Sequence, residues 1–297
     1  MQHARTTRLL STAAVLGALA APTAAQQGED GVWLPGVSAR VTLDYTSQYF
    51  FRGYEQLDAD QGLVLQPGAQ FTLEVVDDVT ATVGTWGSIH TDTAGPPAGV
   101  SNPSSWYEQD IYASLDATLG DFELGVGLTY YTFPSSTFSL DVTELNLSIR
   151  YDDAELLGDF AFNPYVAVAI ELQNNAGPDE NTYLELGGAF TIPTEGTVIE
   201  DWSWSVPFAV GLSIDDYYNR PVAAGGDEEF FGFFRIGLAG SIAVSELLGY
   251  DEWFGAWELG VGVYVLLLNS DVALTDNADG TSDNIQVYAT VGISREW

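Results

Sequence analysis

Apolar side chains occupy every second position over long stretches of the chain, for example within 37–45, 63–75 and 202–214. A period of two residues is typical of a β-strand that has one apolar face. No segment of the sequence shows a convincing helical period of 3.6 residues. The pattern therefore predicts an all-β protein.

Twelve segments carry this alternation, and most of them are 10 to 15 residues long. Strands of soluble sandwiches are about half as long, whereas a tilted strand needs about 9–11 residues to cross a membrane. We expect strands near 38–49, 62–75, 79–90, 106–117, 122–131, 142–151, 160–173, 183–192, 202–214, 230–244, 253–267 and 284–297.

The predicted connections alternate between short ones and mostly longer, polar ones. The short connections cover 76–78, 118–121, 152–159, 193–201 and 245–252, and the longer ones cover 50–61, 91–105, 132–141, 174–182, 215–229 and 269–283. This alternation is typical of an outer-membrane barrel with periplasmic turns and external loops. We expect a transmembrane antiparallel up-and-down β-barrel of about 12 strands with both termini in the periplasm.

A soluble two-sheet sandwich also alternates apolar and polar residues, so other features decide between the two folds. Glycines recur on the polar face, where small side chains leave space in a lumen. Trp297 ends the chain on an apolar face and resembles the signal that bacterial barrel-insertion machinery reads. Aromatic residues gather near strand ends, as interfacial girdles do, at Tyr45, Trp86, Trp106, Tyr107, Tyr130, Tyr131, Tyr183, Trp202, Trp253 and Tyr288.

The N-terminus has the order of a secretory signal peptide. Arg5 and Arg8 precede an apolar run over 9–21, and small residues follow through Ala25. The run is too short for a spanning helix, which needs about 20 apolar residues. We expect a signal peptide over 1–25, a short segment over 26–37 and a barrel over 38–297, exported to the outer membrane of a Gram-negative-type bacterium.

The composition excludes several classes of function. The 297 residues include 42 Asp and Glu against eight basic residues, all of them arginine, so the formal charge is −34. Nucleic-acid binding is excluded because neutralising phosphates needs clustered Lys or Arg. The absence of cysteine excludes disulfides, thiolate nucleophiles and Cys-ligated metals.

Four short motifs follow one another in the first two thirds of the chain. The first, Ser-x-Tyr-x-x-Arg-Gly, contains Tyr49, Arg52 and Gly53, and the second, Gly-x-Trp-Gly-Ser, contains Trp86 and Gly87. The third is Glu-x-Asp-x-Tyr at 108–112. The fourth is Tyr-Tyr-x-Phe-Pro at 130–134 followed by Glu144.

In this order the motifs resemble those of the TorF-type porin family, which groups uncharacterised Gram-negative outer-membrane β-barrel proteins. Phe133 departs from the family pattern, which usually has Tyr there. The resemblance covers about 40–190 well and the rest of the chain by pattern only. It implies a barrel and is consistent with a pore, but it implies no mechanism.

If the apolar side chains face lipid, the alternate side chains face the lumen. The inward acids then outnumber the inward arginines and give a net charge of −7, so the lumen would attract cations. We expect a porin-like channel for passive diffusion of small cations or polar solutes. Its lining would be Asp44, Glu74, Glu108, Asp110, Asp116, Glu123, Glu144, Glu171, Glu185 and Glu258 with Arg40, Arg150 and Arg235.

Two alternatives stay open. The barrel could be a non-conducting structural or adhesive one with acidic, ion-binding loops, its lumen filled by salt bridges and by Tyr112, Tyr131, Tyr165 and Tyr264. Arg52 could fold inward to pair with lumen acids, or it could hold its own loop through Glu55 or Asp58.

We predict no enzyme and no catalytic residue. Ser88 and His90 share a face of one strand, but such neighbours lie about 6–7 Å apart and would not naturally hydrogen-bond. No prosthetic group is expected. Acidic loops could bind Ca²⁺ or Mg²⁺ loosely, at Asp276, Asp279 and Asp283, although this segment departs from EF-hand spacing. The expected partners are outer-membrane lipid, lipopolysaccharide, the insertion machinery and small cations.

Overall fold

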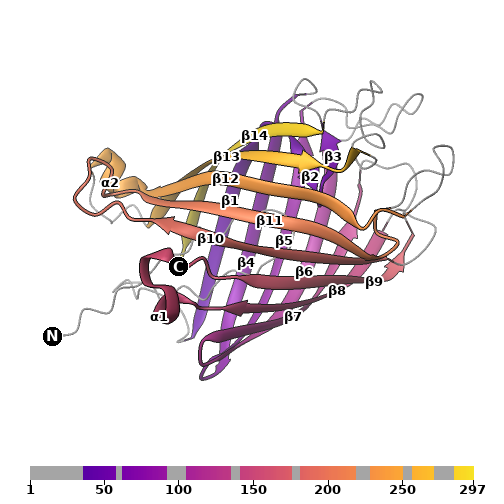
Figure 1. Ribbon diagram of the computed structural model, residues 1–297, viewed down its shortest axis with the longest axis horizontal. Helices are drawn as coiled ribbons and strands as arrows, with labels where there is room; N and C mark the ends of the chain where they lie inside the picture. Colours follow the sequence, from indigo (N-terminus) through magenta and orange to yellow (C-terminus); the bar gives the residue numbers. More distant parts are fainter. Residues whose placement is uncertain are drawn as a thin grey trace.

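Twelve long strands form one closed antiparallel barrel in the computed structural model, which describes residues 36–57, 62–91, 105–134, 141–175, 181–218, 228–249, 256–270 and 284–297 (Figure 1). This confirms the predicted fold class. The barrel strands are β1 (Val37–Thr46), β4 (Val64–Val76), β5 (Val79–His90), β6 (Trp106–Leu119), β7 (Phe122–Thr132), β8 (Asp141–Tyr151), β9 (Tyr165–Asn174), β10 (Thr182–Ile192), β11 (Ser203–Asp215), β12 (Phe231–Ala243), β13 (Trp257–Leu268) and β14 (Ile285–Glu296).

The barrel closes where the first strand meets the last. β1 pairs with β4 on one side and with β14 on the other. The backbone N–H of Trp297 donates to the Ala39 carbonyl at 2.9 Å, and the N–H of Ala39 donates back at 3.1 Å. The barrel therefore has no open sheet edge, as a membrane-spanning sheet requires.

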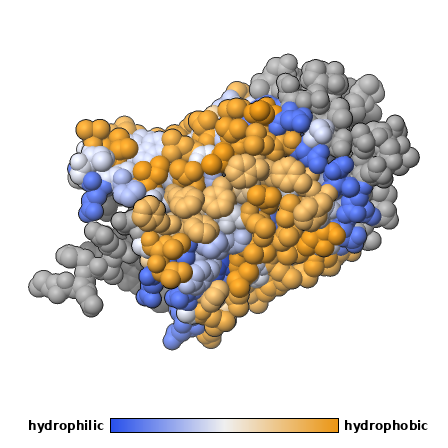
Figure 2. Space-filling model, viewed as in Figure 1, coloured by the Kyte–Doolittle hydropathy of each residue, from blue (hydrophilic) through white to orange (hydrophobic). Residues whose placement is uncertain are grey.

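The outer wall is apolar. Phe71, Ile111 and Leu238, each on the alternate face of its strand, are exposed although they are large and hydrophobic. Figure 2 shows hydrophobic residues over a broad part of the strand region, with hydrophilic residues towards both ends. Such a band is the surface that a barrel presents to hydrocarbon.

The two ends of the barrel differ. At the turn end lie the connections over 77–78, 120–121, 152–164 and 193–202, with α1 (Ala154–Leu157), the 3₁₀ turn η1 (Gly158–Phe160) and α2 (Val244–Leu248). The opposite end, where β1, β5, β7 and β9 finish, is called the loop end below.

No helix in the described ranges has the length and apolar composition that crossing a membrane requires.

A short hairpin departs from the predicted strand pattern. β1 ends at Thr46 instead of continuing to Tyr49, and the next residues form β2 (Tyr49–Phe51) and β3 (Tyr54–Leu57), a separate two-stranded sheet near the loop end (Figure 1). Arg52 and Gly53 between them have φ of 49° and 89°, which is typical of a two-residue type I′ turn. We call residues 47–57 the lumen hairpin.

Candidate functional site

The pairing register places every predicted lining residue at an inner-face position of its strand. Glu108, Asp110, Glu144, Glu185 and Arg235 are buried there. Glu74, at the turn end of β4, is exposed. The remaining ones are half-buried, namely Asp44, Asp116, Glu123, Glu171, Glu258, Arg40 and Arg150. Inner-wall residues of a wide barrel are buried only where something fills the lumen, and near the loop end the lumen hairpin does so.

Arg52, at the tip of the hairpin, makes the strongest contact with the wall. Its guanidinium Nη1 and Nη2 donate to Oε1 and Oε2 of Glu144 at 2.6 and 2.8 Å. Both side chains are buried, and the Tyr131 hydroxyl donates to Glu144 Oε2 at 2.8 Å. This two-bond fork is the strongest common geometry of an ion pair in proteins. Of the two alternatives for Arg52, the structure therefore shows the inward one.

Aromatic rings surround the same guanidinium. Its central carbon lies 4.5 Å from the ring centre of Tyr183, 4.9 Å from Phe51 and 5.4 Å from Tyr217. Tyr218 donates its hydroxyl to the Arg52 carbonyl at 2.8 Å. Burial raises the pKa of the Tyr218 phenol well above its usual value, so this hydroxyl keeps its proton as a donor.

The base of the hairpin is held by other contacts. The Tyr49 hydroxyl donates to Glu108 Oε2 at 2.7 Å, and its ring centre lies 5.8 Å from that of Trp86. Ser47 donates its N–H to the Ala289 carbonyl at 2.9 Å, and the N–H of Ala289 donates to Ser47 Oγ at 2.9 Å. The hairpin is therefore fixed at its base and at its tip.

The four sequence motifs thus meet in one place. The first motif forms the hairpin, Trp86 of the second packs on Tyr49, Glu108 of the third accepts the Tyr49 hydroxyl, and Tyr131 and Glu144 of the fourth hold Arg52. Sequence reasoning identified these motifs separately but did not see that they form a single network.

Aromatic side chains also line the inner wall on β9, β10, β13 and β14. Phe50 of the hairpin lies 5.6 Å from Tyr288, which stacks on Tyr264 at 5.0 Å. Glu185 accepts hydroxyl hydrogen bonds from Tyr165 and Tyr183, both at 2.6 Å. Arg235 is also buried on this wall, and its Nε has no hydrogen-bond partner in the part of the chain that the structure describes.

A family model described as "Bacterial protein of unknown function (Gcw_chp)" matches residues 34–204, more than half of the chain. The protein belongs to this Gcw_chp family. The matched range contains the hairpin together with Trp86, Glu108, Tyr131 and Glu144. The comparison with curated proteins finds no match. The TorF-type resemblance is carried by the same residues and stays a prediction.

Solved structures similar to this Gcw_chp protein are outer-membrane barrels. One is an outer membrane channel from Pseudomonas putida F1, with a TM-score of 0.50 and 10% identity, covering 92% of this chain and 100% of the other. Another is the NanC porin, with a TM-score of 0.46 and 9% identity, covering 86% and 98%. At such low identity, the likeness to the channel shows the fold alone.

Five of the aromatic residues predicted for the lipid girdles lie elsewhere in this Gcw_chp barrel. A bulge between Ser88 and Ile89 shifts the pairing with β6, which leaves Trp106 exposed and brings the Tyr107 hydroxyl to Gln56 of the hairpin. The girdle assignment is therefore wrong for Trp86, Tyr107, Tyr131, Tyr183 and Tyr288, which pack inside. Tyr45 and Tyr130 occupy outer-face positions, and Trp253 lies outside the described residues.

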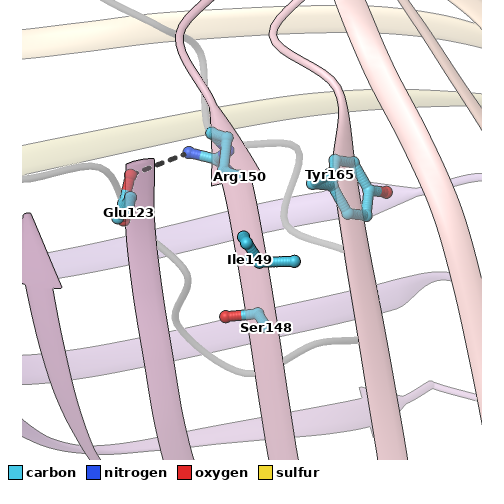
Figure 3. Close-up of a pocket in the computed structure, with 5 residues that line it drawn as sticks. All are labelled: Glu123, Ser148, Ile149, Arg150 and Tyr165. Atoms are coloured by element: carbon cyan, nitrogen blue, oxygen red, sulfur yellow. Dashed lines mark ion pairs between the residues drawn. The ribbon is translucent and has the colours of Figure 1, made fainter. Parts of the chain in front are cut away.

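The turn half of the lumen is less filled. Arg150 contacts Glu123 at 3.6 Å, and both side chains are partly exposed (Figure 3). They line a pocket together with Ser148, Ile149 and Tyr165, and its volume of about 10 Å³ holds about one water molecule (Figure 3).

The expectation for Ser88 and His90 is wrong in one respect. Ser88 Oγ and His90 Nε2 lie 3.0 Å apart and hydrogen-bond, and the imidazole is stacked on Tyr107 at 4.6 Å between ring centres. Both residues are buried, and no described residue bonds to Nδ1 of His90. Among the described residues, no third group orients this histidine as in a catalytic triad.

Several predictions fall on residues that the structure does not describe. These are the signal peptide over 1–25, Asp58, and the candidate calcium ligands Asp276, Asp279 and Asp283. Within the described ranges, no group of three or more His, Asp or Glu side chains is arranged to hold a metal ion.

Proposed function

We propose that this protein is a porin-like channel in the outer membrane of a Gram-negative-type bacterium, and that it passes small solutes passively with a preference for cations. The closed barrel and the exposed apolar wall support a position in a membrane. The predicted signal peptide and the resemblance to the TorF-type porins support export to that membrane.

The observation that carries the cation preference is the excess of carboxylates on the inner wall. In the described part of the chain, ion pairs within 4 Å join only Arg52 to Glu144 and Arg150 to Glu123. Asp44, Asp116, Glu171 and Glu258 are half-buried on the inner face without such a partner. Unneutralised carboxylates lining a water-filled passage concentrate cations and repel anions.

The lumen hairpin sets the size of what can pass. It occupies the loop half of the lumen and contacts the wall on β6, β8 and β14, so a solute must pass beside it or move it. Large solutes are therefore excluded in this arrangement.

The test is the reversal potential of the purified full chain in a planar bilayer under a KCl gradient. We expect a reversal potential with the sign of a cation-selective channel. Its magnitude should fall when Asp116→Asn and Glu258→Gln are combined. Glu155→Gln with Glu246→Gln, which removes the same charge from α1 and α2 outside the lumen, should leave the potential unchanged. Anion preference would overturn the proposal.

A second candidate function is a non-conducting structural barrel. The burial of Glu108, Glu144 and Tyr183 on the inner wall favours it, because it shows how completely the hairpin fills the loop half. Folded, heat-modifiable protein that never conducts would decide for this alternative.

A further inference from the structure

We propose that the pocket holding the Arg52 guanidinium is a binding site for solutes that carry a guanidinium group, and that Arg52 occupies it as a tethered ligand of the same chain. This deepens the proposed function, because it names the class of cation that the channel recognises. The site consists of Glu144, Tyr131, Tyr183 and Tyr217 and is called the guanidinium site below.

The chemistry of the site fits a planar cation. Glu144 accepts two N–H bonds from one guanidinium edge, at 2.6 and 2.8 Å, and is itself held by Tyr131. Tyr183 presents its ring to the guanidinium at 4.5 Å. A carboxylate fork with aromatic faces distinguishes guanidinium from ammonium, because an ammonium group is a compact charge without a planar pair of donors.

The site belongs to the barrel rather than to the hairpin. Glu144 lies on β8, Tyr131 on β7 and Tyr183 on β10, while Tyr217 follows β11. Phe51 is the single hairpin ring among the three that surround the guanidinium. The wall groups therefore remain to receive another guanidinium when Arg52 leaves.

A neighbouring carboxylate provides the second observation. Asp110 is 8% exposed, and its Oδ1 has no hydrogen-bond partner among the described residues. It interacts electrostatically with Glu108, Glu144 and Arg52. Three carboxyl groups therefore lie near one arginine here, and Asp110 is the one with an unpartnered buried oxygen. This oxygen can accept a hydrogen bond from an entering guanidinium and offers it a first contact.

The tether sets how strongly a free solute must compete. Arg52 sits on a two-residue turn, and its hairpin is attached separately at Ser47 and Tyr49. A tethered group competes at an effective concentration of about millimolar or more. A free guanidinium can bind only while Arg52 is out of the site. Its apparent affinity is therefore its intrinsic affinity multiplied by the fraction of time that the site is empty.

The test uses calorimetry on the folded full chain in detergent, with methylguanidinium as the probe. We expect Arg52→Ala to bind it saturably, at least about tenfold more tightly than the wild type does. Methylammonium should bind the Arg52→Ala variant at least about tenfold more weakly than methylguanidinium does. Adding Glu144→Gln to Arg52→Ala should abolish the binding.

Arg150→Ala is the matched control. It removes another lumen arginine that is paired with a glutamate, but that pair has a single contact at 3.6 Å. It should create no saturable methylguanidinium site. Equal binding by this control, equal binding of methylammonium, or binding that survives Glu144→Gln would overturn the proposal, because each points to general charge attraction.

Arg52→Lys covers the case in which Arg52→Ala does not fold. Lysine keeps the charge beside Glu144 but cannot donate the pair of N–H bonds that a guanidinium donates to the two Glu144 oxygens. Methylguanidinium should therefore displace the lysine side chain from Glu144. A folded Arg52→Lys protein without saturable binding would overturn the site. Because binding is measured without a membrane, a barrel that binds but does not conduct refutes only the channel function. A barrel that conducts but does not bind refutes only the site.

Discussion

Two arginine–glutamate pairs inside this barrel have very different surroundings. Arg52 and Glu144, in the loop half, form a fork with side chains 0% and 2% exposed. Arg150 and Glu123, in the turn half, meet at 3.6 Å with side chains 23% and 17% exposed. The same two residue types thus form a fixed, desolvated contact in one half and a loose, hydrated one in the other.

The difference comes mainly from the hairpin. Both halves have polar and charged side chains on the inner wall, yet the loop half is packed because a piece of the chain enters it and packs against aromatic side chains of the wall. Buried charges are costly unless they are fully paired, whereas hydrated ones are not. The comparison teaches that the strength of an ion pair in a barrel depends on what fills the lumen beside it.

The largest difference in stability should appear when the glutamate of each ion pair is replaced by glutamine. Glu144→Gln leaves the Arg52 charge buried without its counter-ion and should lower the free energy of unfolding by about 3–5 kcal/mol. Glu123→Gln should cost less than about 1 kcal/mol, because water replaces the lost contact. Urea unfolding in detergent measures both. Similar losses for the two variants would contradict the distinction between the halves.

An intermediate effect should follow from adding one methyl group at a turn in each half. Gly53 and Gly120 both have positive φ, at 89° and 63°, so alanine costs about 1–2 kcal/mol at either position. A Cβ at Gly53 would also lie 2.9 Å from the buried ring of Phe233, whereas nothing lies within 4 Å of one at Gly120. Gly53→Ala should therefore be the more destabilising by about 1 kcal/mol or more. Equal midpoints of urea unfolding would show that Phe233 yields easily.

The smallest effect concerns pH and the Tyr218 hydroxyl. Burial raises the pKa of Tyr218 well above about 10, so the unfolded chain ionises first and stability falls as pH rises beyond that value. At pH 8, Tyr218→Phe should cost about 1 kcal/mol through the lost bond to the Arg52 carbonyl.

Between pH 8 and pH 11 the gap in unfolding free energy between wild type and Tyr218→Phe should narrow, because only the wild type loses stability through this group. A gap that stays constant over this range would mean that the phenol ionises equally in the folded and unfolded chains.

The barrel could be predicted from the sequence because its signal is periodic and local. Alternation located all twelve barrel strands and the inner-face positions of residues such as Glu108 and Glu185. The hairpin escaped because Tyr49 and Phe50 are buried on both faces of a three-residue strand, which leaves no alternation to read. Its signal was the Arg52-Gly53 turn between aromatic residues.

The partners within the site could not be predicted in the same way. Arg52 and Glu144 lie 92 positions apart, and the sequence alone favoured local acids such as Glu55 as the partner of Arg52. The bulge beside Ile89 moves Tyr107 from the outer face of its strand to the inner face, and strict alternation along a sequence cannot anticipate such an insertion. Packing inside the lumen, rather than periodicity, determines both the partner of Arg52 and the position of Tyr107.

The contact between Ser47 and Ala289 bears on how the barrel wall is held closed. β1 and β14 form the one junction in the ring that joins the two ends of the chain, and this contact extends their pairing beyond Thr46. The hairpin begins at that point and reaches across to β8. The hairpin that occupies the lumen therefore also strengthens the pairing of β1 with β14. Separating these two strands would also have to break the contact between the hairpin and Ala289.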